Sequence, residues 1–294
     1  MNASNQRKPE WLKAQIPSGS TYFKLKKELN ERNLATICQS ARCPNVNECW
    51  NRGHATFLAM GDTCSRNCFF CAVKKGKPQG LDDREDQRIL DMAQIMDLSY
   101  LVVTSVTRDD LADRGGHHLG RIVRTLKDFR PNMKVEILVP DFSGLLDCLD
   151  AVLDASPDVL AHNLETVREL YPKVNRDSEN YSLSLRILKH SHRRNAVTKS
   201  GIMVGLGESL REILETFADL REAQVDIVTI GQYLQPNAAS VPVQKYYTPD
   251  EFVDLQKSAR TFGFSAVDAG PFVRSSYHSD HLYQMVRNEV PGIQ

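Results

Sequence analysis

The sequence has no long apolar run and no net charge, and each absence excludes a class of protein. An apolar run such as Tyr100-Leu101-Val102-Val103 is far shorter than the roughly 18 residues that a membrane span needs. Lysine plus arginine and aspartate plus glutamate both number 37, so no global charge favours nucleic acid or a membrane surface. The first residues lack the apolar core of a secretory signal, and Glu10 with sparse arginines makes a poor organellar presequence. We therefore expect a soluble, cytoplasmic protein with no membrane or nucleic-acid partner.

Cysteine is scarce over most of the chain and concentrated in one window. All seven cysteines except Cys148 fall between residues 38 and 71. Persistent disulfides are not expected in a reducing cytoplasm, and 294 residues with 41% hydrophobic side chains can bury a core without covalent staples. The window therefore indicates metal binding or catalysis, whereas Cys148, in an apolar segment, is expected to be a small buried side chain.

The clustered cysteines form two triplets with different spacings. Their members are Cys38, Cys43 and Cys49 (C-x4-C-x5-C), and Cys64, Cys68 and Cys71 (C-x3-C-x2-C). Neither triplet matches the paired knuckles of a structural zinc site. Iron–sulfur clusters accept such spacings, and four thiolates are their usual complement, so three leave one iron open to a ligand from outside the protein. An open, Lewis-acidic iron favours an enzyme over an electron carrier.

Downstream of the cysteines, short β-branched runs alternate with longer amphipathic segments, which is typical of repeated βα units around a parallel sheet. Strands are predicted at residues 56–60, 101–106, 134–139, 159–163, 200–204 and 226–230. Helical spacing of apolar residues occurs within 89–96, 119–126 and 210–217. Six βα units predict an α/β fold of incomplete, (β/α)6-type TIM-like barrel form. Active sites of such folds lie at the carboxyl ends of the strands.

Three polar segments follow predicted strands and are candidate site residues. They are Thr107-Arg108-Asp109-Asp110, His162-Asn163-Leu164-Glu165-Thr166 and Gly201-Ile202-Met203-Val204-Gly205-Leu206-Gly207-Glu208. The first segment could equally be a solvated turn with a helix N-cap. The glycines of the third could open a dinucleotide-binding turn, but Leu210 stands where that fingerprint needs its third glycine.

The second triplet resembles the signature of the radical S-adenosylmethionine (SAM) superfamily, C-x3-C-x-aromatic-C. The resemblance implies that Cys64, Cys68 and Cys71 hold a [4Fe–4S] cluster whose open iron binds SAM, and that Phe70 lies near the adenine. One electron from the cluster would then cleave the sulfonium to methionine and a 5′-deoxyadenosyl radical.

Other residues match the superfamily pattern in part. Its fifth-strand motif, G-x-I-x-G-x-x-E, is met with methionine in place of isoleucine, whereas its Gly-Gly-Glu after the second strand is absent. That absence leaves open how the amino group of SAM is held. The resemblance implies SAM contacts from Phe70, Arg108, Asp109, Asn163, Glu165, Gly201, Gly205 and Glu208.

The first triplet, within the segment from Cys38 to Trp50, narrows the resemblance to the lipoyl synthase family. The likeness continues through Ser105-Val106-Thr107-Arg108-Asp109-Asp110, His162-Asn163-Leu164-Glu165-Thr166 and Arg274-Ser275-Ser276-Tyr277. It implies that Cys38, Cys43 and Cys49 hold an auxiliary [4Fe–4S] cluster, that Ser276 ligates its fourth iron, and that Arg274 contacts the substrate. Without the family, the serine pair would be interpreted as an ordinary turn.

The resemblance also implies a reaction. Two sulfur atoms, taken from the auxiliary cluster, would enter C6 and C8 of an octanoyl chain carried on a protein lysine. The implied partners are octanoylated lipoyl carrier domains, namely acyltransferase subunits of 2-oxoacid dehydrogenases and the H protein of glycine cleavage. Reduced ferredoxin or flavodoxin would supply electrons, and an iron–sulfur carrier protein would rebuild the consumed cluster.

Three segments are expected within one structural domain. They are an N-terminal extension (1–54) with the auxiliary-cluster cysteines, a partial barrel (55–265), and a C-terminal segment (266–294) that caps the active site with the Arg-Ser-Ser-Tyr motif. The alternatives are another two-cluster radical SAM enzyme and a non-enzymatic two-cluster electron carrier. A zinc-binding nucleic-acid module is opposed by the neutral charge and the ligand count.

Overall fold

A computed structural model of the chain describes residues 7–289. These residues form two compact units that interleave along the sequence. The first unit contains residues 7–13, 68–71 and 161–289, and the second contains residues 14–67 and 72–160. The short segment with Cys68 and Cys71 thus belongs to a different unit from Cys64. No helix within 7–289 has both the length and the apolar character required to cross a membrane.

The second unit is an α/β layer built on parallel strands. Strands β2, β5 and β6 run parallel, and β1 pairs antiparallel with β2. Its elements are α1 (Ser20–Glu31), β1 (Ala35–Thr36), α2 (Ile37–Ser40), α3 (Val46–Asn51), β2 (Thr56–Ala59), β3 (Thr63–Cys64), β4 (Lys74–Lys75), α4 (Glu85–Ile95), β5 (Tyr100–Ser105), α5 (Gly116–Phe129), β6 (Lys134–Leu138), η2 (Phe142–Gly144) and α6 (Leu146–Leu153). The register places the carboxyl ends of β2 and β5 side by side, with Ala59 opposite Ser105.

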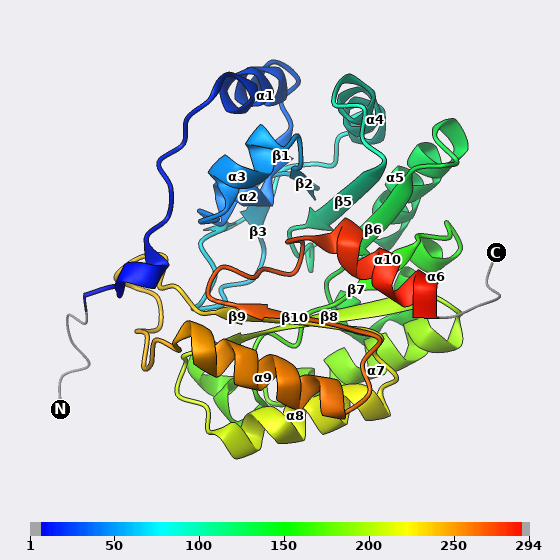
Figure 1. Ribbon diagram of the computed structural model, residues 1–294. Coiled ribbons are helices and arrows are strands. Elements are labelled where there is room, and N and C mark those ends of the chain that lie inside the picture. The colour runs from blue at the N-terminus through cyan, green and yellow to red at the C-terminus, as the bar shows by residue number, and fades with distance from the viewer. Residues whose placement is uncertain (1–6, 290–294) are drawn as a thin grey trace. The chain divides into compact units, whose positions relative to one another are not determined.

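The first unit also consists of parallel strands that alternate with helices. Strands β8, β9 and β10 run parallel and in register (Figure 1). Strand β7 (Val159–Ala161) contributes residues to both units. The other elements are η1 (Glu10–Leu12), η3 (Arg168–Leu170), η4 (Pro172–Val174), α7 (Glu179–Arg193), β8 (Val197–Val204), α8 (Leu210–Glu222), β9 (Ile227–Gln232), α9 (Pro249–Thr261), β10 (Ala266–Gly270) and α10 (Ser279–Glu289).

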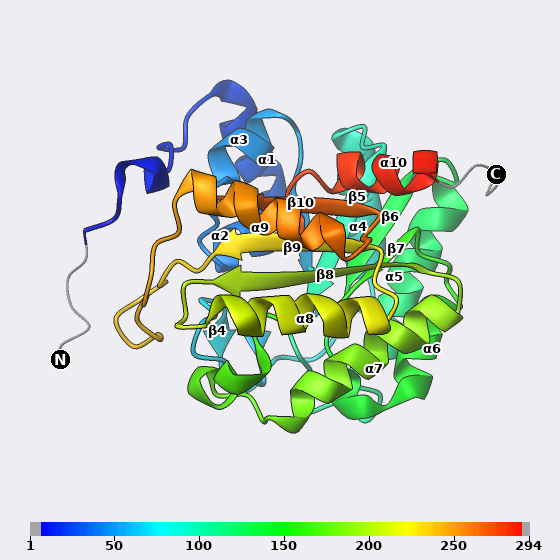
Figure 2. The same ribbon diagram turned by 60° about the horizontal axis from the view of Figure 1, so that its bottom comes forward.

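Side-chain alternation explains how helices cover β9 and β10. Val228 and Val267, which are register partners, belong to the large core cluster that includes residues of α8 and α9. The preceding partners, Ile227 and Ala266, instead pack with Leu282 of α10. Because successive strand residues point to opposite faces, α10 lies on the face opposite to α8 and α9 (Figure 2).

Helices α8 and α9 both begin with a capping box. Ser209 and Thr248 are N-caps whose hydroxyls accept from the N–H groups of Glu212 and Glu251, and both glutamates reach back to the N-cap backbone. Each capping box satisfies backbone donors that the first helical turn leaves open. The ends of β8 and β9 are therefore followed by well-defined helix starts.

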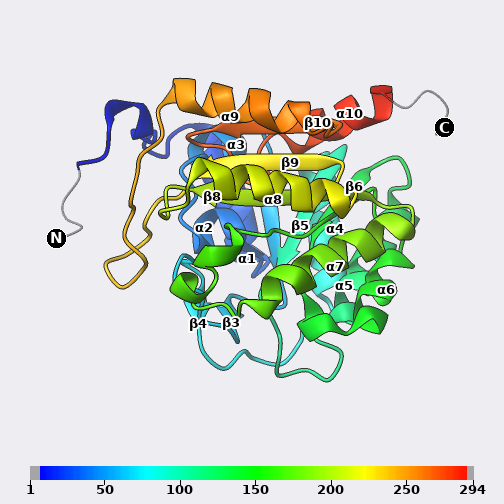
Figure 3. The same ribbon diagram turned by 90° about the horizontal axis from the view of Figure 1, so that it is seen from below.

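In the second unit, α5 and α6 approach each other at glycine (Figure 3). A Cβ atom at Gly116 would stand 2.4 Å from the carbonyl oxygen of Cys148, and one at Gly120 would stand 2.3 Å from that of Ala151. Cys148 is buried at this crossing, as predicted. Only a residue without a side chain lets the two backbones meet so closely.

We expect Gly120→Ala to lower the free energy of unfolding by about 1–3 kcal/mol, because the added methyl group forces the helices apart. Equilibrium unfolding in urea measures this loss. Gly80→Ala is the matched control, since nothing lies within 4 Å of the Cβ position of Gly80. Equal stabilities of the two variants would contradict a close α5–α6 contact.

The predicted α/β class with repeated βα units is confirmed. All six predicted strands are present as β2, β5, β6, β7, β8 and β9, with ends that differ by a few residues. The prediction omits β10, whose sequence Ala-Val-Asp-Ala-Gly contains a single β-branched residue. The three predicted helical segments lie in or overlap α4, α5 and α8.

Candidate active site

The first cysteine triplet lies around two short helices of the second unit. Cys38 is in α2, Cys49 is in α3, and Cys43 is in the turn between them. The Cys43 N–H donates to the carbonyl of Cys38 at 2.9 Å, and the Thr36 hydroxyl caps α2 by accepting from Gln39. None of the three forms a disulfide. Short helices joined by a tight turn thus bring three potential sulfur ligands into one small segment.

The surroundings of this triplet favour protonated thiols as long as no cation is bound. Burial raises the pKa of the Cys38 thiol, and burial together with the neighbouring Cys43 and Cys38 raises that of Cys49 to about 12. A cluster bound here would displace the thiol protons and supply the positive charge that stabilises the thiolates. The Nε1–H of buried Trp50 lies close enough to Cys38 to affect its pKa, yet has no hydrogen-bond acceptor within residues 7–289. Such an unpaired donor fits a thiolate or sulfide acceptor.

The second triplet begins at the end of β3. Cys64 pairs with Lys75 of β4, and the Arg66 N–H donates to the Cys64 Sγ at 3.4 Å. In the first unit, the Cys71 N–H donates to the carbonyl of Cys68 at 3.2 Å, and partly buried Phe70 packs against the core cluster. Among the described residues, no three His, Cys, Asp or Glu side chains are grouped closely enough to hold a metal ion. The ligand role of this triplet stays a prediction from spacing.

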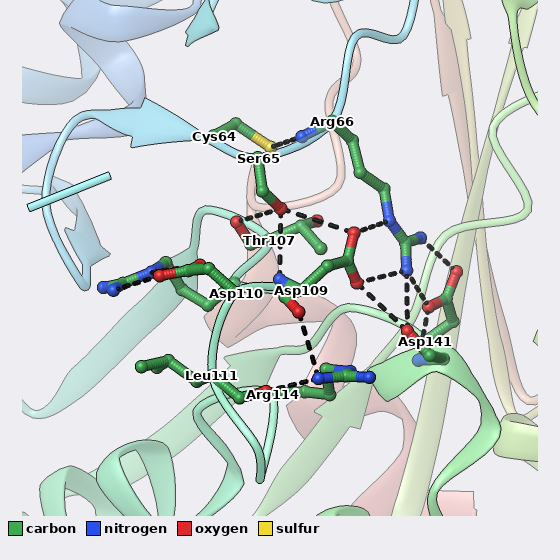
Figure 4. A network of polar contacts seen from close by, with 11 residues as sticks. Cys64, Ser65, Arg66, Thr107, Asp109, Asp110, Leu111, Arg114 and Asp141 are labelled. Carbon is green, nitrogen blue, oxygen red and sulfur yellow. Dashed lines mark hydrogen bonds and ion pairs between the residues drawn. The ribbon is translucent and has the colours of Figure 1, made fainter. Parts of the chain in front are cut away.

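A charged network follows β5 and β6 in the second unit (Figure 4). Arg66 donates to both oxygens of Asp109 at 2.7 and 2.9 Å, and to both oxygens of Asp141 at 2.5 and 2.7 Å. Burial opposes the charge of Asp109, but Arg66 holds the pKa of this carboxyl below its usual range. Asp141 is 1% exposed. Sequence reasoning selected Asp109 and missed the other two charged members of this network, Arg66 and Asp141.

Arg108 lies next to Asp109 in the sequence but has a different role. It is 2% exposed and donates from Nε and Nη2 to Asp110 at 2.9 and 2.8 Å. Its Nη1 is buried and has no acceptor within residues 7–289, and the same holds for the hydroxyl of Ser105 at the end of β5. A buried guanidinium with an unused N–H is suited to bind an anion.

In the first unit, the predicted residues Asn163, Glu165 and Gly201 lie together. The Ser275 hydroxyl donates to Asn163 Oδ1 at 2.9 Å, and a Cβ atom at Gly201 would stand 2.8 Å from Ser275 Oγ. Glu165 forms a bridge with Ile202 of β8, and burial raises the pKa of its carboxyl. The segment after β7, the strand β8 and the serine motif near the C-terminus thus meet at one place.

The turn between β8 and α8 is held by Glu208. Its carboxylate accepts from the N–H groups of Gly205 at 2.5 Å and Leu206 at 2.9 Å. Gly205 has a φ of +104°, and a Cβ there would stand 2.3 Å from Nε2 of Gln232. The need for glycine at this position therefore follows from the packing of the chain itself. Contact of Gly205 and Glu208 with SAM stays a prediction.

We expect Glu208→Gln to lower the free energy of unfolding by about 1–3 kcal/mol, because an amide leaves one of the two N–H groups facing a donor. Urea unfolding at neutral pH measures the change. Glu215→Gln, on the exposed side of the following helix α8, removes only an ion pair with Arg211 and should cost less than about 0.5 kcal/mol. A loss at Glu208 no larger than at Glu215 would contradict this role of the carboxylate.

The Arg-Ser-Ser-Tyr motif lies between β10 and α10. Arg274 Nη1 donates to the carbonyl of Val273 at 2.6 Å, and the Tyr277 N–H donates to the carbonyl of Arg274 at 2.9 Å, which closes a turn around half-buried Ser276. Ser276 belongs to the first unit and the cysteines at 38, 43 and 49 to the second. Its ligand role, like the substrate contact of Arg274, stays a prediction.

Sequence reasoning did not select three residues at these sites. They are Arg66, Asp141 and Gln232. Arg66 stands inside the cysteine motif, so its position between two ligands could have marked it. Asp141 follows β6 and Gln232 is the last residue of β9, so the position of both at strand ends was the available signal.

Comparison with known proteins places this arrangement in a family. The family model of the radical SAM superfamily matches residues 58–220, and that of the N-terminal domain of lipoyl synthase matches residues 1–43. The lipoyl synthase of Symbiobacterium thermophilum is 48% identical over 280 residues, which cover 95% of this chain and 87% of the relative. That of Parabacteroides distasonis is 44% identical and covers 95% and 99%. The chain belongs to the lipoyl synthase family.

Solved structures agree with a radical SAM fold for this lipoyl synthase family member. Streptococcus suis SuiB bound to S-adenosylmethionine superposes with a TM-score of 0.56 at 13% identity, covering 83% of this chain and 60% of SuiB. Methylornithine synthase gives a TM-score of 0.52 at 13% identity and covers 92% of both chains. At such low identity the likeness concerns the fold alone, and it confirms the fold class predicted from the sequence.

Proposed function

We propose that this chain is a radical SAM enzyme that inserts two sulfur atoms into a protein-bound octanoyl-lysine, at C6 and C8, to form the lipoyl group. The observation that carries the proposal is the 48% identity to a curated lipoyl synthase along 95% of the chain. Both cysteine triplets and the Arg-Ser-Ser-Tyr motif lie within the chain. An electron carrier would need neither the βα units nor this last motif.

Membership of the radical SAM superfamily implies SAM and a [4Fe–4S] cluster. The donor set fits, because Cys64, Cys68 and Cys71 form no disulfide, and three thiolates would leave one iron open for SAM. When bound, the cluster supplies the electron that cleaves SAM and so provides a radical able to take hydrogen from an unactivated C–H bond. No acid or base in the chain can activate such a bond.

Residues of the chain would hold SAM by complementary charge and shape. We assign the carboxylate of SAM to Arg108, because the buried Nη1 of this residue has no acceptor within residues 7–289. Phe70 would lie against the adenine. The remaining contacts are proposed from the superfamily pattern and come from Asn163, Glu165, Gly201, Gly205 and Glu208.

The auxiliary cluster would be a substrate of the reaction, because its sulfide is transferred to the product. Cys38, Cys43 and Cys49 would hold it, and the unpaired Nε1–H of Trp50 would donate to sulfur beside Cys38. Ser276 would complete the ligand set. A serine oxygen is a harder ligand than a thiolate and exchanges more readily at iron, which suits a cluster that must come apart.

The substrate would be an octanoylated lipoyl carrier domain of a 2-oxoacid dehydrogenase acyltransferase or of the glycine cleavage H protein, with Arg274 as a contact. Reduced ferredoxin or flavodoxin would deliver one electron for each of the two SAM molecules. An iron–sulfur carrier would restore the consumed cluster. None of the seven cysteines forms a disulfide, which is compatible with a reducing cytoplasm.

An anaerobic single-turnover assay tests the proposal. The reconstituted chain is mixed with SAM, a strong reductant and an octanoyl-lysyl peptide, and mass spectrometry follows the peptide and 5′-deoxyadenosine. Addition of two sulfur atoms with release of two 5′-deoxyadenosines is the expected result. Release of 5′-deoxyadenosine without any sulfur in the peptide would favour the second candidate, a radical SAM enzyme that uses its second cluster in another way.

A further inference from the structure

We propose that Arg66, Asp109 and Asp141 form a positioning network that holds the cysteine loop ready for its cluster, and that Asp109 acts through Arg66 rather than by contact with SAM. The inference rests on the proposed function only in that Cys64 and Cys68 ligate a cluster. It deepens that function by assigning a role to Asp109, which lies in the segment where the superfamily has Gly-Gly-Glu.

The guanidinium of Arg66 is fixed by two forked contacts. Nε and Nη2 reach the two oxygens of Asp109, and Nη1 and Nη2 reach the two oxygens of Asp141, with all four distances between 2.5 and 2.9 Å. Figure 4 shows the guanidinium between the two carboxylates. A planar guanidinium that binds a carboxylate on each side has little freedom to rotate. A lysine ammonium could not form the same pair of two-point contacts.

Ser65, the residue before Arg66, is hydrogen-bonded to the segment that follows β5. The Ser65 N–H and hydroxyl both donate to the carbonyl of Thr107, at 3.1 and 3.0 Å. The Asp109 N–H in turn donates to the Ser65 hydroxyl at 3.1 Å. Ser65 and Arg66 lie between two proposed cluster ligands, Cys64 and Cys68. The contacts therefore fix the backbone from which the Arg66 N–H points to Cys64 Sγ.

Asp141 is held as firmly as its partner. Its Oδ1 also accepts from the N–H of Ser143, at 2.9 Å, and Phe142 and Ser143 have positive φ angles of 48° and 52°. Non-glycine residues adopt such angles at a cost, and the surrounding contacts must maintain them. The turn after β6 is thus shaped to present a buried carboxylate to Arg66.

The hydrogen bonds of Asp109 leave little capacity for a ligand. Oδ1 accepts from Arg66 Nη2 and from the Ser143 hydroxyl, and Oδ2 accepts from Arg66 Nε and from the Ser65 hydroxyl. A carboxylate has about four lone-pair sites. Arg66 and Ser143 occupy three of them, and the Ser65 hydroxyl, whose one hydrogen is shared with the Thr107 carbonyl, lies at the fourth. Arg108 and Ser105, by contrast, keep unused buried groups. Asp109 is therefore a positioning residue.

The test follows the cluster itself, in the full-length chain and in a full-length Cys43→Ala chain, where only the cluster of the second triplet is expected. Iron release to a chelator and the EPR spectrum of the reduced cluster are measured for Arg66→Gln and Asp141→Asn. We expect each to lose iron about 10–100 times faster, the range for residues that support metal ligands, with shifted g-values. The double variant Arg66→Gln/Asp109→Asn should be no worse than Arg66→Gln alone.

Two matched variants control for a merely structural effect. Arg130→Gln removes a contact with Asp97 in the same unit, and Asp158→Asn weakens a buried carboxylate that pairs with Lys127. Both should keep wild-type iron release and EPR spectra. If Arg66→Gln does not fold, Arg66→Lys keeps the charge without the double fork, and it should give faster iron release at an unchanged melting temperature.

Wild-type iron release and an unchanged spectrum in a folded Arg66 variant would overturn the proposal. A weaker SAM affinity in Asp109→Asn that is absent from Arg66→Gln would overturn the role assigned to Asp109. None of these readouts needs the octanoyl substrate. A chain that behaves as expected here but inserts no sulfur would contradict the proposed function alone.

Discussion

Cys43→Ala is expected to abolish insertion of sulfur into an octanoyl-lysyl peptide while the chain still releases 5′-deoxyadenosine from SAM. Removal of one thiolate leaves only two sulfur ligands in the segment of α2 and α3, so the auxiliary cluster is lost. A direct ligand should contribute more than the roughly 100-fold that ligand-supporting residues can contribute, so product should fall below that fraction. Mass spectrometry of the peptide and chromatography of 5′-deoxyadenosine measure the two outcomes in one reaction.

The matched control for this substitution is Cys148→Ala. Cys148 is also a free thiol of the second unit, but it is buried beside Gly116 of α5, away from both cysteine triplets in the sequence. Its removal should leave both products unchanged. Sulfur insertion by Cys43→Ala at the wild-type level would show that the sulfur comes from elsewhere.

Cys68→Ala is expected to abolish both products. The remaining Cys64 and Cys71 cannot hold a cluster with an open iron, so no electron reaches SAM and no radical forms. Because sulfur insertion requires hydrogen abstraction first, the intact auxiliary cluster cannot compensate. Formation of 5′-deoxyadenosine should fall by more than about 100-fold, measured with dithionite as reductant.

The auxiliary cluster provides an internal control for the second variant. Cys68→Ala should retain about half of the wild-type iron, since each triplet is proposed to hold one cluster. The same assay applied to Cys43→Ala should also give half, yet with SAM cleavage intact. Cleavage of SAM by Cys68→Ala at the wild-type rate would contradict the assignment of the second triplet.

The strands could be predicted because β-branched runs separate them clearly from amphipathic helices. Residues such as Val102, Val103 and Ile230 are buried in strands, as their pattern indicates. Strand β10 could not be predicted in this way, because most of its residues are small or polar. Its place is decided by pairing with β9 along its whole length, a contact that no local pattern reports.

The sequence predicted which residues belong to the candidate site, but it did not predict which partner each side chain contacts. Arg108 and Asp109 were selected together, yet Arg108 donates to Asp110 and Asp109 accepts from Arg66. Adjacent residues project differently, and Asp109 meets an Arg66 that is also bound by Asp141, which lies far along the chain. Sequence spacing reports the motif, whereas burial and long-range charge pairs decide what each side chain does.

The segment from Cys68 to Cys71 has a consequence for biogenesis. The Phe69 N–H donates to the carbonyl of Val174, and the Val241 N–H donates to the carbonyl of Phe69. Both partners lie more than a hundred residues downstream, so they are synthesised long after the cysteines have left the ribosome. Loops of such length must close before these contacts can form. Two of the three thiols at 64, 68 and 71 therefore reach their final places only when most of the chain has been translated, and we expect loading of the proposed cluster to follow synthesis.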